Sequence, residues 1–214
     1  MYVPRLFKND QLGDLHALIQ THPLGILVTE LNGRPEATHV PCVLDRDAGS
    51  WGTLRFHLAG TNPSAGALDN GQALVIFSGP DSYISPDWYR ADNHVPTWNY
   101  TVVHAYGRPE VMDDDALADL LADLSAASEA RLPKEPWTTD KLPPDLYAKM
   151  RRAIVGFRMP IDELQGKWKL GQNRKPEARA GVVESLRELE EPRAAAVAEL
   201  MAAVAKGTGE VGPN

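Results

Sequence analysis

Short apolar runs with strand-like spacing dominate the first three quarters of the chain. The segment 53–59 alternates, with Leu54, Phe56 and Leu58 on one face, as a half-buried strand does. Pro41 places its own strand at a sheet edge or beside a bulge, because proline has no N–H for the ladder. Similar runs predict further strands at 24–30, 37–44, 73–77, 101–111, 153–164 and 167–170.

Leucines at helical spacing predict helices around these strands. Residues 10–21 and 113–131 each carry an apolar stripe, and the second begins with three aspartates that suit the positive end of a helix dipole. Further helices are expected after Pro143 and Pro144 and, as a pair, within 177–206. Because several strands follow one another with short loops only, a regular alternation of strand and helix is disfavoured. The pattern predicts a mainly β, α+β protein with a closed or half-closed antiparallel barrel and helices packed outside.

Prolines and glycines mark the expected ends of these elements. Ser78, Gly79 and Pro80 predict a loop after the strand 73–77. Pro160 predicts a break in the strand 153–164, because a proline inside a ladder removes one hydrogen bond.

The net charge of the chain argues against one class of function, nucleic-acid binding. The 214 residues include 22 Lys and Arg against 29 Asp and Glu, a formal net charge of −7. A nucleic-acid binder needs clustered cations, so this balance disfavours one. The single cysteine, Cys42, allows no intramolecular disulfide, and no apolar run has the length of a signal peptide or a membrane span. We therefore expect a cytoplasmic protein with no membrane segment.

The segment 78–100 holds five of the eleven Trp and Tyr residues of the chain. Planar rings with polar tips suit the walls of a ligand pocket, and they suit equally well a core that a loop covers. Either as pocket walls or as a covered core, the side chains concerned are Tyr83, Trp88, Tyr89, Trp98 and Tyr100.

The segment 166–175 carries four cations and no acid in a chain that is acidic overall. Lys167 and Lys169 alternate with apolar residues, so on a strand both lysines share one face while Trp168 and Leu170 pack inward. Such a cluster can hold a phosphate or a carboxylate through charge-assisted hydrogen bonds, and the alternative is a solvated basic turn. The remaining polar candidates of this segment are Gln172, Asn173 and Arg174.

Three histidines, His39, His57 and His104, fall inside predicted strands. Without an HExxH motif or paired Cys and His ligands, a zinc site is not expected. A strand histidine is usually a satisfied core or rim residue, but a neutral imidazole also binds haem iron. His57, on the polar face of its strand, is the first candidate for a haem ligand and His104 the second. No nucleophile or nucleotide-loop motif occurs, so the catalytic residues stay unassigned.

A collinear series of short motifs over roughly residues 1–185 resembles the PaiB family. The motifs are MYVPRLF at 1–7, HPLG at 22–25, ATHVP at 37–41, HLA-x-x-NP at 57–63, GP-x-x-YISP-x-WY at 79–89, VPTWNY at 95–100, VH-x-x-G at 103–107, IVGF at 154–157 and GKWKLGQNR at 166–174.

The PaiB family is described as FMN-binding negative transcriptional regulators. It is similar to the flavin-binding split β-barrels, such as pyridoxamine-phosphate oxidases, which are homodimers with the flavin at the dimer interface. The resemblance therefore implies a split β-barrel, a homodimer and an FMN site. Candidate FMN-binding residues within the matched motifs are His57, Asn62, Tyr83, Ser85, Trp88, Tyr89, Trp98, Tyr100, Lys167, Lys169, Gln172, Asn173 and Arg174.

The same resemblance implies a domain plan and leaves alternatives open. We expect a split-barrel cofactor-binding domain at 1–175, a helical extension at 176–206 and a disordered tail at 207–214. The family's wider circle includes haem-dependent enzymes that form the nitrogen–nitrogen bond of piperazate, so haem is an alternative to FMN. A direct DNA-binding repressor is another alternative, with 166–175 as its basic face. Indirect regulation, through a metabolite or an enzyme activity, fits the acidic charge better.

The chain departs from the usual family pattern in two places. Gly60, Ala65 and Gly66 replace an arginine, a tryptophan and a second arginine, and Asp81 stands where a histidine is common. Two arginines that could hold a phosphate are therefore missing near His57. The cations of 166–175 would have to take their place.

Overall fold

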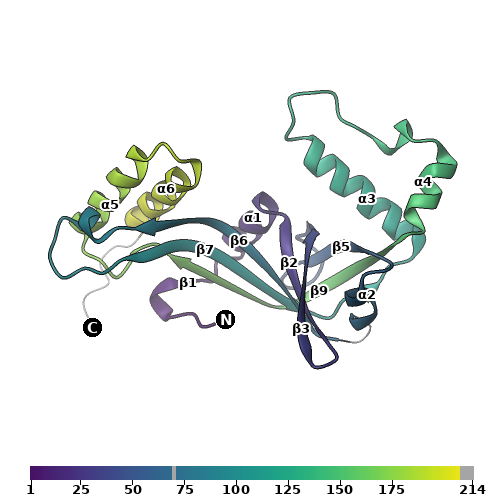
Figure 1. The fold of residues 1–214 in the computed structure, drawn as a ribbon, viewed down its shortest axis with the longest axis horizontal. Helices are drawn as coiled ribbons and strands as arrows, with labels where there is room; N and C mark the ends of the chain where they lie inside the picture. Colours follow the sequence, from purple (N-terminus) through teal and green to yellow (C-terminus); the bar gives the residue numbers. More distant parts are fainter. Residues whose placement is uncertain (69–70, 208–214) are drawn as a thin grey trace. The chain divides into compact units, whose positions relative to one another are not determined.

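The computed structural model describes residues 1–68 and 71–207 (Figure 1). The tail expected at 207–214 lies outside these residues except for Gly207, the last residue of the last helix. The strands are β1 (Lys8–Asn9), β2 (Leu24–Leu31), β3 (Arg34–Pro41), β4 (Val43–Asp45), β5 (Thr53–Ala59), β6 (Ala73–Ile84), β7 (Thr97–Gly107), β8 (Glu110–Val111) and β9 (Ile154–Lys169). The α-helices are α1 (Leu12–Thr21), α2 (Pro63–Ala67), α3 (Asp114–Glu129), α4 (Pro144–Arg151), α5 (Pro176–Glu188) and α6 (Pro192–Gly207), and the 3-10 turns are η1 (Arg5–Phe7), η2 (Pro86–Tyr89) and η3 (Thr139–Lys141).

The strands form an antiparallel sheet in the order β3-β2-β6-β7-β9-β5-β4, and β1 and β8 also pair with β9. This arrangement, with its flanking helices, confirms the predicted α+β class. The strand that ends at Pro41 is β3, which lies at one end of the order, so its predicted edge position is confirmed. The ladder is open, and within the second unit β3 also contacts β5.

The chain folds into two compact units, which are described separately below. The first unit consists of Met1–Gln11, Ser78–Val103 and Gln165–Asn214. The second unit consists of Leu12–Phe77 and His104–Leu164. No helix among the described residues is both long enough and apolar enough to cross a membrane.

The core of the second unit is built on the predicted alternation of β5. Leu54, Phe56 and Leu58 are buried, and the Phe56 ring stacks on Phe157 of β9 with 5.7 Å between centroids. Full burial of such a side chain contributes about 2–3 kcal/mol to stability. Helix α1 closes one side of this core, and its buried His16 places Nε2 2.9 Å from the Trp51 carbonyl oxygen.

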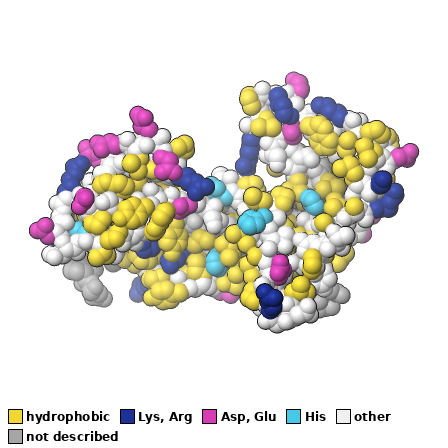
Figure 2. Space-filling view, in the orientation of Figure 1, with side chains coloured by type: hydrophobic (Ala, Val, Ile, Leu, Met, Phe, Trp, Pro, Cys, Tyr) yellow, Lys and Arg dark blue, Asp and Glu magenta, His cyan; other side chains and the backbone are white. Residues whose placement is uncertain are grey.

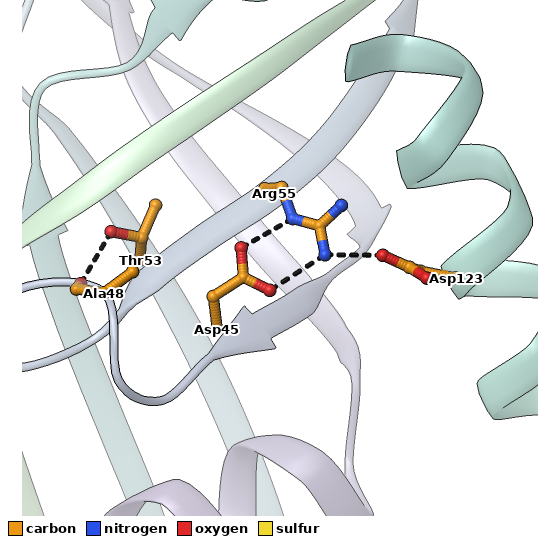
Figure 3. Close-up of polar contacts among 5 residues, drawn as sticks. All are labelled: Asp45, Ala48, Thr53, Arg55 and Asp123. Atoms are coloured by element: carbon orange, nitrogen blue, oxygen red, sulfur yellow. Dashed lines mark hydrogen bonds and ion pairs between the residues drawn. The ribbon is translucent and has the colours of Figure 1, made fainter. Parts of the chain in front are cut away.

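Arg55 ties three elements of the second unit together on the opposite face of β5 (Figure 3). Its Nε and Nη2 donate to the two carboxylate oxygens of Asp45 on β4 at 2.6 and 2.8 Å. Nη2 also donates to Asp123 on α3 at 2.7 Å. Only 15% of the Arg55 side chain is exposed, so its charge is largely removed from water and depends on the two carboxylates. The bond to Asp123 links α3 to the sheet.

Two strands are longer than their sequence pattern predicts. β6 continues through Ser78, Gly79 and Pro80, where we expected a loop, and β9 runs through Pro160 without the expected break. Pro160 lies opposite Thr53, the first residue of β5, and the N–H of the next residue, Ile161, donates to Gly52 O at 3.1 Å. The missing N–H of Pro160 therefore falls at the end of a ladder, where the chain tolerates it.

The burial pattern changes phase by one residue within both long strands. The odd-numbered residues of β6 are buried up to Phe77, and after it Ser82 and Ile84 are buried. In β9 the change falls at the exposed pair Asp162 and Glu163. A one-residue shift of this kind moves the following side chains to the other face, which is the effect of a β-bulge. In both strands it coincides with the boundary between the two units.

In the first unit, the predicted pair of C-terminal helices is present as α5 and α6, which pack on each other. Asn99 Nδ2 on β7 donates to Met201 Sδ on α6 at 3.2 Å, so α6 covers the buried face of β7. Helix α5 packs on η2, where a Cβ at Gly181 would lie 2.5 Å from Trp88 O. Only glycine permits this approach.

Candidate functional site

The sheet of the first unit has one covered face and one open face. On β7, Asn99, Thr101 and Val103 are buried, while Trp98 and Tyr100 point to the opposite face. Trp98 is 53% exposed and lies edge-on to Tyr83 of β6, with 6.0 Å between their ring centroids. Figure 2 shows hydrophobic side chains at the surface over β6 and β7, with Lys and Arg side chains near them. We call this side of the sheet the open face.

Lys167 and Lys169 of β9 share one face, as their alternation predicts. Trp168 between them and Leu170 after them are buried. The Lys167 Nζ lies 5.4 Å from the centre of the Tyr100 ring and 5.9 Å from that of Tyr2. The basic side chain therefore lies against the aromatic rings of the open face, an arrangement that attracts through the ring quadrupole.

Lys169 is half-buried and hydrogen-bonded to β7. Its Nζ donates to Thr97 Oγ1 at 2.5 Å and to the Trp98 carbonyl oxygen. Burial lowers its pKa, and the positive charges of Lys167 and Arg174 lower it further. Lys169 is thus close enough to Lys167 and to Arg174 to be repelled by both. A bound anion would relieve this repulsion.

Arg174 lies in the turn that leads from β9 to α5. Its guanidinium carbon is 5.3 Å from the centre of the Tyr89 ring, and Tyr89 in turn stacks on His94 at 4.3 Å. Tyr89 is buried, so this part of the aromatic segment fits the interpretation as a covered core. The turn contains Gly171 at φ +75, and Arg174 N–H donates to its carbonyl oxygen at 2.9 Å.

Gln172 and Asn173 differ in what they can offer a ligand. The side-chain amide of Gln172 closes its own turn, because Oε1 accepts from Leu170 N–H at 2.8 Å and Nε2 donates to Trp168 O at 2.6 Å. Gln172 therefore shapes the loop, while Asn173 is exposed. Ser85 is the residue before η2 and Trp88 lies within η2, next to Tyr89. Both are half-buried.

The open face contains a depression of about 400 Å³. A volume of this size is within the range of small-molecule sites. Its single acidic lining residue is Asp81, which pairs with Arg193 of α6 at 3.7 Å. The lining residues are Ser78, Gly79, Asp81, Trp98, Tyr100, Thr101 and Val102.

Within residues 1–68 and 71–207, no carboxylate pairs with the cations Lys167, Lys169 or Arg174. The charge of these three cations is therefore available to a ligand.

Most of the site residues predicted from the sequence belong to the first unit. Eleven of the candidates belong to it, namely Tyr83, Ser85, Trp88, Tyr89, Trp98, Tyr100, Lys167, Lys169, Gln172, Asn173 and Arg174.

The other two candidates, His57 and Asn62, belong to the second unit. Asn62 is the N-cap of α2: its Oδ1 accepts from Ser64 N–H at 2.9 Å, and its Nδ2 donates to Thr38 Oγ1 at 3.4 Å. Both ends of this side chain are therefore engaged in local structure.

His57 lies opposite Gly156, on the face of β5 that carries Arg55 toward α3. Its Nδ1 is buried and has no hydrogen-bond partner among the described residues, and burial lowers its pKa. Burial also lowers the pKa of His104, whose Nδ1 is 3.5 Å from the Tyr106 hydroxyl. Both imidazoles are therefore held toward the neutral form.

The described residues contain no group of three or more His, Cys, Asp or Glu that could hold a metal ion. Cys42 is a buried free thiol, and burial raises its pKa to about 12. It is therefore a thiol and not a thiolate at neutral pH, as expected for an unreactive cysteine.

Two residues of the open face were not singled out from the sequence. Tyr2 contacts Lys167 through its ring and its carbonyl oxygen, which accepts from Nζ at 3.3 Å. Thr97 accepts a hydrogen bond from Lys169. Both lie within motifs of the PaiB resemblance, MYVPRLF and VPTWNY, so the signal was present without an assigned role.

The chain is similar to known proteins over most of its length. Residues 1–163 match the family model described as "Putative FMN-binding domain". The chain is 35% identical over 202 residues to "Protease synthase and sporulation protein PAI 2" of Bacillus subtilis, covering 94% of this chain and 96% of that protein. It is also 31% identical over 229 residues to an uncharacterized protein of Emericella nidulans, covering 88% and 91%.

Solved structures share the fold at low sequence identity. The FAD and haem binding protein from Mycobacterium smegmatis matches with a TM-score of 0.57 at 20% identity, covering 81% of this chain and 78% of that one. The flavocytochrome Anf3 from Azotobacter vinelandii matches with a TM-score of 0.59 at 19% identity, covering 84% and 78%. The predicted split-barrel fold with flanking helices is confirmed. On the family match and the relationship to PAI 2, this chain belongs to the PaiB family of FMN-binding domains.

Proposed function

We propose that this protein binds FMN on the open face of the first unit. The observation that carries the proposal is the group of three cations, Lys167, Lys169 and Arg174, which have no carboxylate partner among the described residues. Lys167 lies over the Tyr100 ring, and Lys169 is close enough to both other cations to be repelled by them. A phosphate is the anionic group of FMN, and cations of this kind bind phosphate through charge-assisted hydrogen bonds. The family description names the same cofactor.

The aromatic part of the open face fits the other end of the ligand. Trp98 and Tyr83 offer exposed ring surface, and Tyr100 links the depression to Lys167. In this proposal the cations would hold the phosphate while the rings line the flavin ring system. FMN when bound would supply redox chemistry, and the protein would supply binding, orientation and positive potential. A flavin-dependent oxidoreductase-like activity follows from this as a proposal.

We also infer a homodimer that buries part of the open face. Tyr2, Tyr83, Val95 and Trp98 are between 44% and 83% exposed, which is unusual for a solvent-facing surface. A second copy would cover these side chains and complete the wall of the site. Sedimentation analysis should give a dimer for the wild type and a monomer for Trp98→Asp. A wild-type monomer at micromolar concentration contradicts this part of the proposal.

A titration with FMN tests the binding proposal. Flavin fluorescence is followed as protein is added, for the wild type and for the double variant Lys167→Ala, Lys169→Ala. We expect the double variant to lose at least about tenfold in affinity, and the wild type to weaken as salt is raised, because the contact is ionic. Lys149→Ala on α4 is the matched control and should bind as the wild type does. No flavin binding by the wild type, or equal binding by the double variant, would overturn the proposal.

Haem is a second candidate, favoured by one observation. The His57 Nδ1 is buried without a partner, and burial holds the imidazole toward its neutral form. A neutral imidazole is a good axial ligand for iron. Haem titration of the wild type, His57→Ala and His104→Ala tests it: a Soret band that His57→Ala alone abolishes supports His57, and an unchanged band removes it.

Any effect on transcription is proposed to be indirect. Three of the four cations of 166–175 do not form a row facing solvent, because Lys167 and Arg174 lie over aromatic rings and Lys169 is half-buried. Only the fourth, Lys175, is exposed. This arrangement suits a local anion better than a DNA backbone. A salt-dependent mobility shift on promoter DNA, lost in Lys167→Ala, would contradict the inference.

A further inference from the structure

The covered face of the first unit contains a buried cation that the proposed flavin site does not use. Arg179, in the first turn of α5, is only 8% exposed. Its Nε is fully buried without a hydrogen-bond partner, and no carboxylate within residues 1–68 and 71–207 pairs with it. A buried charge without a counter-charge costs several kcal/mol, so a structure normally supplies one.

One polar side chain lies near Arg179, and its donor has only a weak acceptor. A Cβ built on Gly171 would lie 3.7 Å from Arg179 Cγ and 3.9 Å from Asn99 Nδ2, so both side chains converge on the turn before α5. The Asn99 amide donates to the sulfur of Met201, which is a weak acceptor. Two residues along the same face of β7, the Thr101 hydroxyl is buried without a partner.

The end of α5 adds further donors to this place. Its N-cap residue is Lys175, which makes no side-chain capping bond, and the first intrahelical bond runs from Arg179 N–H to Lys175 O. The preceding N–H groups of Glu177 and Ala178 therefore have no acceptor within the helix. The helix dipole favours negative charge at the same end.

We propose that Arg179, Asn99 and the first turn of α5 form an anion site that takes a small oxyanion, a phosphate or a carboxylate group, in addition to the proposed flavin site. Arg179 Nε, Asn99 Nδ2 and the first N–H groups of α5 are donors without a strong acceptor, and the guanidinium offers a planar fork that matches two oxygens of such a group. The oxyanion would supply the counter-charge of Arg179. It would thereby hold α5 on the turn that carries Arg174.

Thermal unfolding of the full chain in inorganic phosphate tests the proposal, with sodium chloride of equal ionic strength as the reference. For the wild type we expect the midpoint to rise with phosphate by about 5 °C or more at roughly 100 times the dissociation constant. The comparison is made in the Lys167→Ala, Lys169→Ala background, so that phosphate bound at the proposed flavin site does not contribute. In that background Arg179→Met should abolish the rise. Arg187→Met, an exposed position on the same helix, is the matched control and should respond as the wild type does.

A second variant retains Arg179 and keeps the test valid if Arg179→Met does not fold. Asn99→Asp places a carboxylate beside the guanidinium, so the protein should be more stable without phosphate and should no longer respond to it. Lys167→Ala, Lys169→Ala should keep the phosphate response, which separates this site from the flavin site. Three outcomes would each overturn the proposal: an equal rise in chloride, a rise that persists when Arg179→Met is added to the double lysine variant, or a rise that the double lysine variant loses completely.

Discussion

The guanidinium carbon of Arg174 lies 5.3 Å from the centre of the buried Tyr89 ring. The contact fixes a cation of the β9–α5 turn against η2, so that its charge adds to those of Lys167 and Lys169. An arginine held in this way loses less rotamer freedom when it binds an anion than a free surface arginine does.

Replacing Arg174 by glutamine should therefore weaken FMN binding. A hydrogen bond to a charged group contributes about 1.5–3 kcal/mol, so the dissociation constant should rise by about tenfold or more. Fluorescence titration measures the effect. Arg187→Gln, on the exposed side of α5, should leave the affinity unchanged. Equal affinities for the wild type and Arg174→Gln would show that Arg174 does not touch the cofactor.

Flavin binding should also depend on alkaline pH through Lys169. Burial and the charges of Lys167 and Arg174 lower the pKa of this amine from the usual 10.5. An anion binds best while the amine is charged, so affinity should begin to fall at a pH below 10.5. In Lys169→Arg the side chain stays charged, and this early decline should disappear. The same decline in Lys169→Arg would assign it to another group.

The same pKa has a consequence for the stability of the free protein. The pKa of this lysine is lower in the folded state than in the unfolded state. At a pH below the lowered pKa the amine is charged in both states, and its charge then reduces the free energy of unfolding. As the pH rises from the lowered pKa toward 10.5, this penalty is removed. Compared with Lys169→Met, the wild type should therefore gain stability over that interval. Parallel pH profiles of the two proteins in denaturant unfolding would contradict the expectation.

Gly107, the last residue of β7, should not tolerate a side chain. A Cβ there would lie 2.3 Å from Pro160 O and 2.8 Å from Met159 Cγ. Since backbone must move to relieve this overlap, Gly107→Ala should lower the free energy of unfolding by about 2 kcal/mol or more. Gly13→Ala is the control: it is in α1 with no atom within 4 Å of the new Cβ, and should raise stability by about 0.5–1 kcal/mol. Denaturant unfolding measures both, and equal effects would contradict the prediction.

The ionic contact of Arg55 with Asp45 and Asp123 should contribute unequally to stability. Arg55→Met leaves two carboxylates without their partner beside the sheet and should cost about 1–3 kcal/mol. Asp123→Asn should cost less, about 0.5 kcal/mol, because Asp123 is 52% exposed and water screens it. Denaturant unfolding of both variants gives the comparison. A larger loss in Asp123→Asn would contradict this ranking.

Much of the secondary structure could be predicted because local periodicity carries it. The alternation of 53–59 predicted β5 with its bounds and its buried face, and the leucine spacing of 113–131 predicted α3, whose N-cap is Asp113. Lys167 and Lys169 lie on one face for the same reason: the period of a strand is two residues.

The ends of β6 and β9 could not be predicted in this way. Local signals at Pro80 and Pro160 indicate a loop and a break, but both strands continue, because pairing with neighbours distant in sequence outweighs the lost hydrogen bond. Likewise, the motif GKWKLGQNR does not show that the side-chain amide of Gln172 is hydrogen-bonded within its own turn.

The sequence by itself determined the α+β class, the positions of most strands and helices, the excess of positive charge at 166–175 and the family motifs. These features depend on residue type and short-range spacing. Only the tertiary structure decided which rings are exposed, that Tyr2 and Thr97 join the lysines, and that Arg179 is buried without a counter-charge. The physical reason is that burial and charge pairing are set by contacts between segments distant in the chain, which no local pattern encodes.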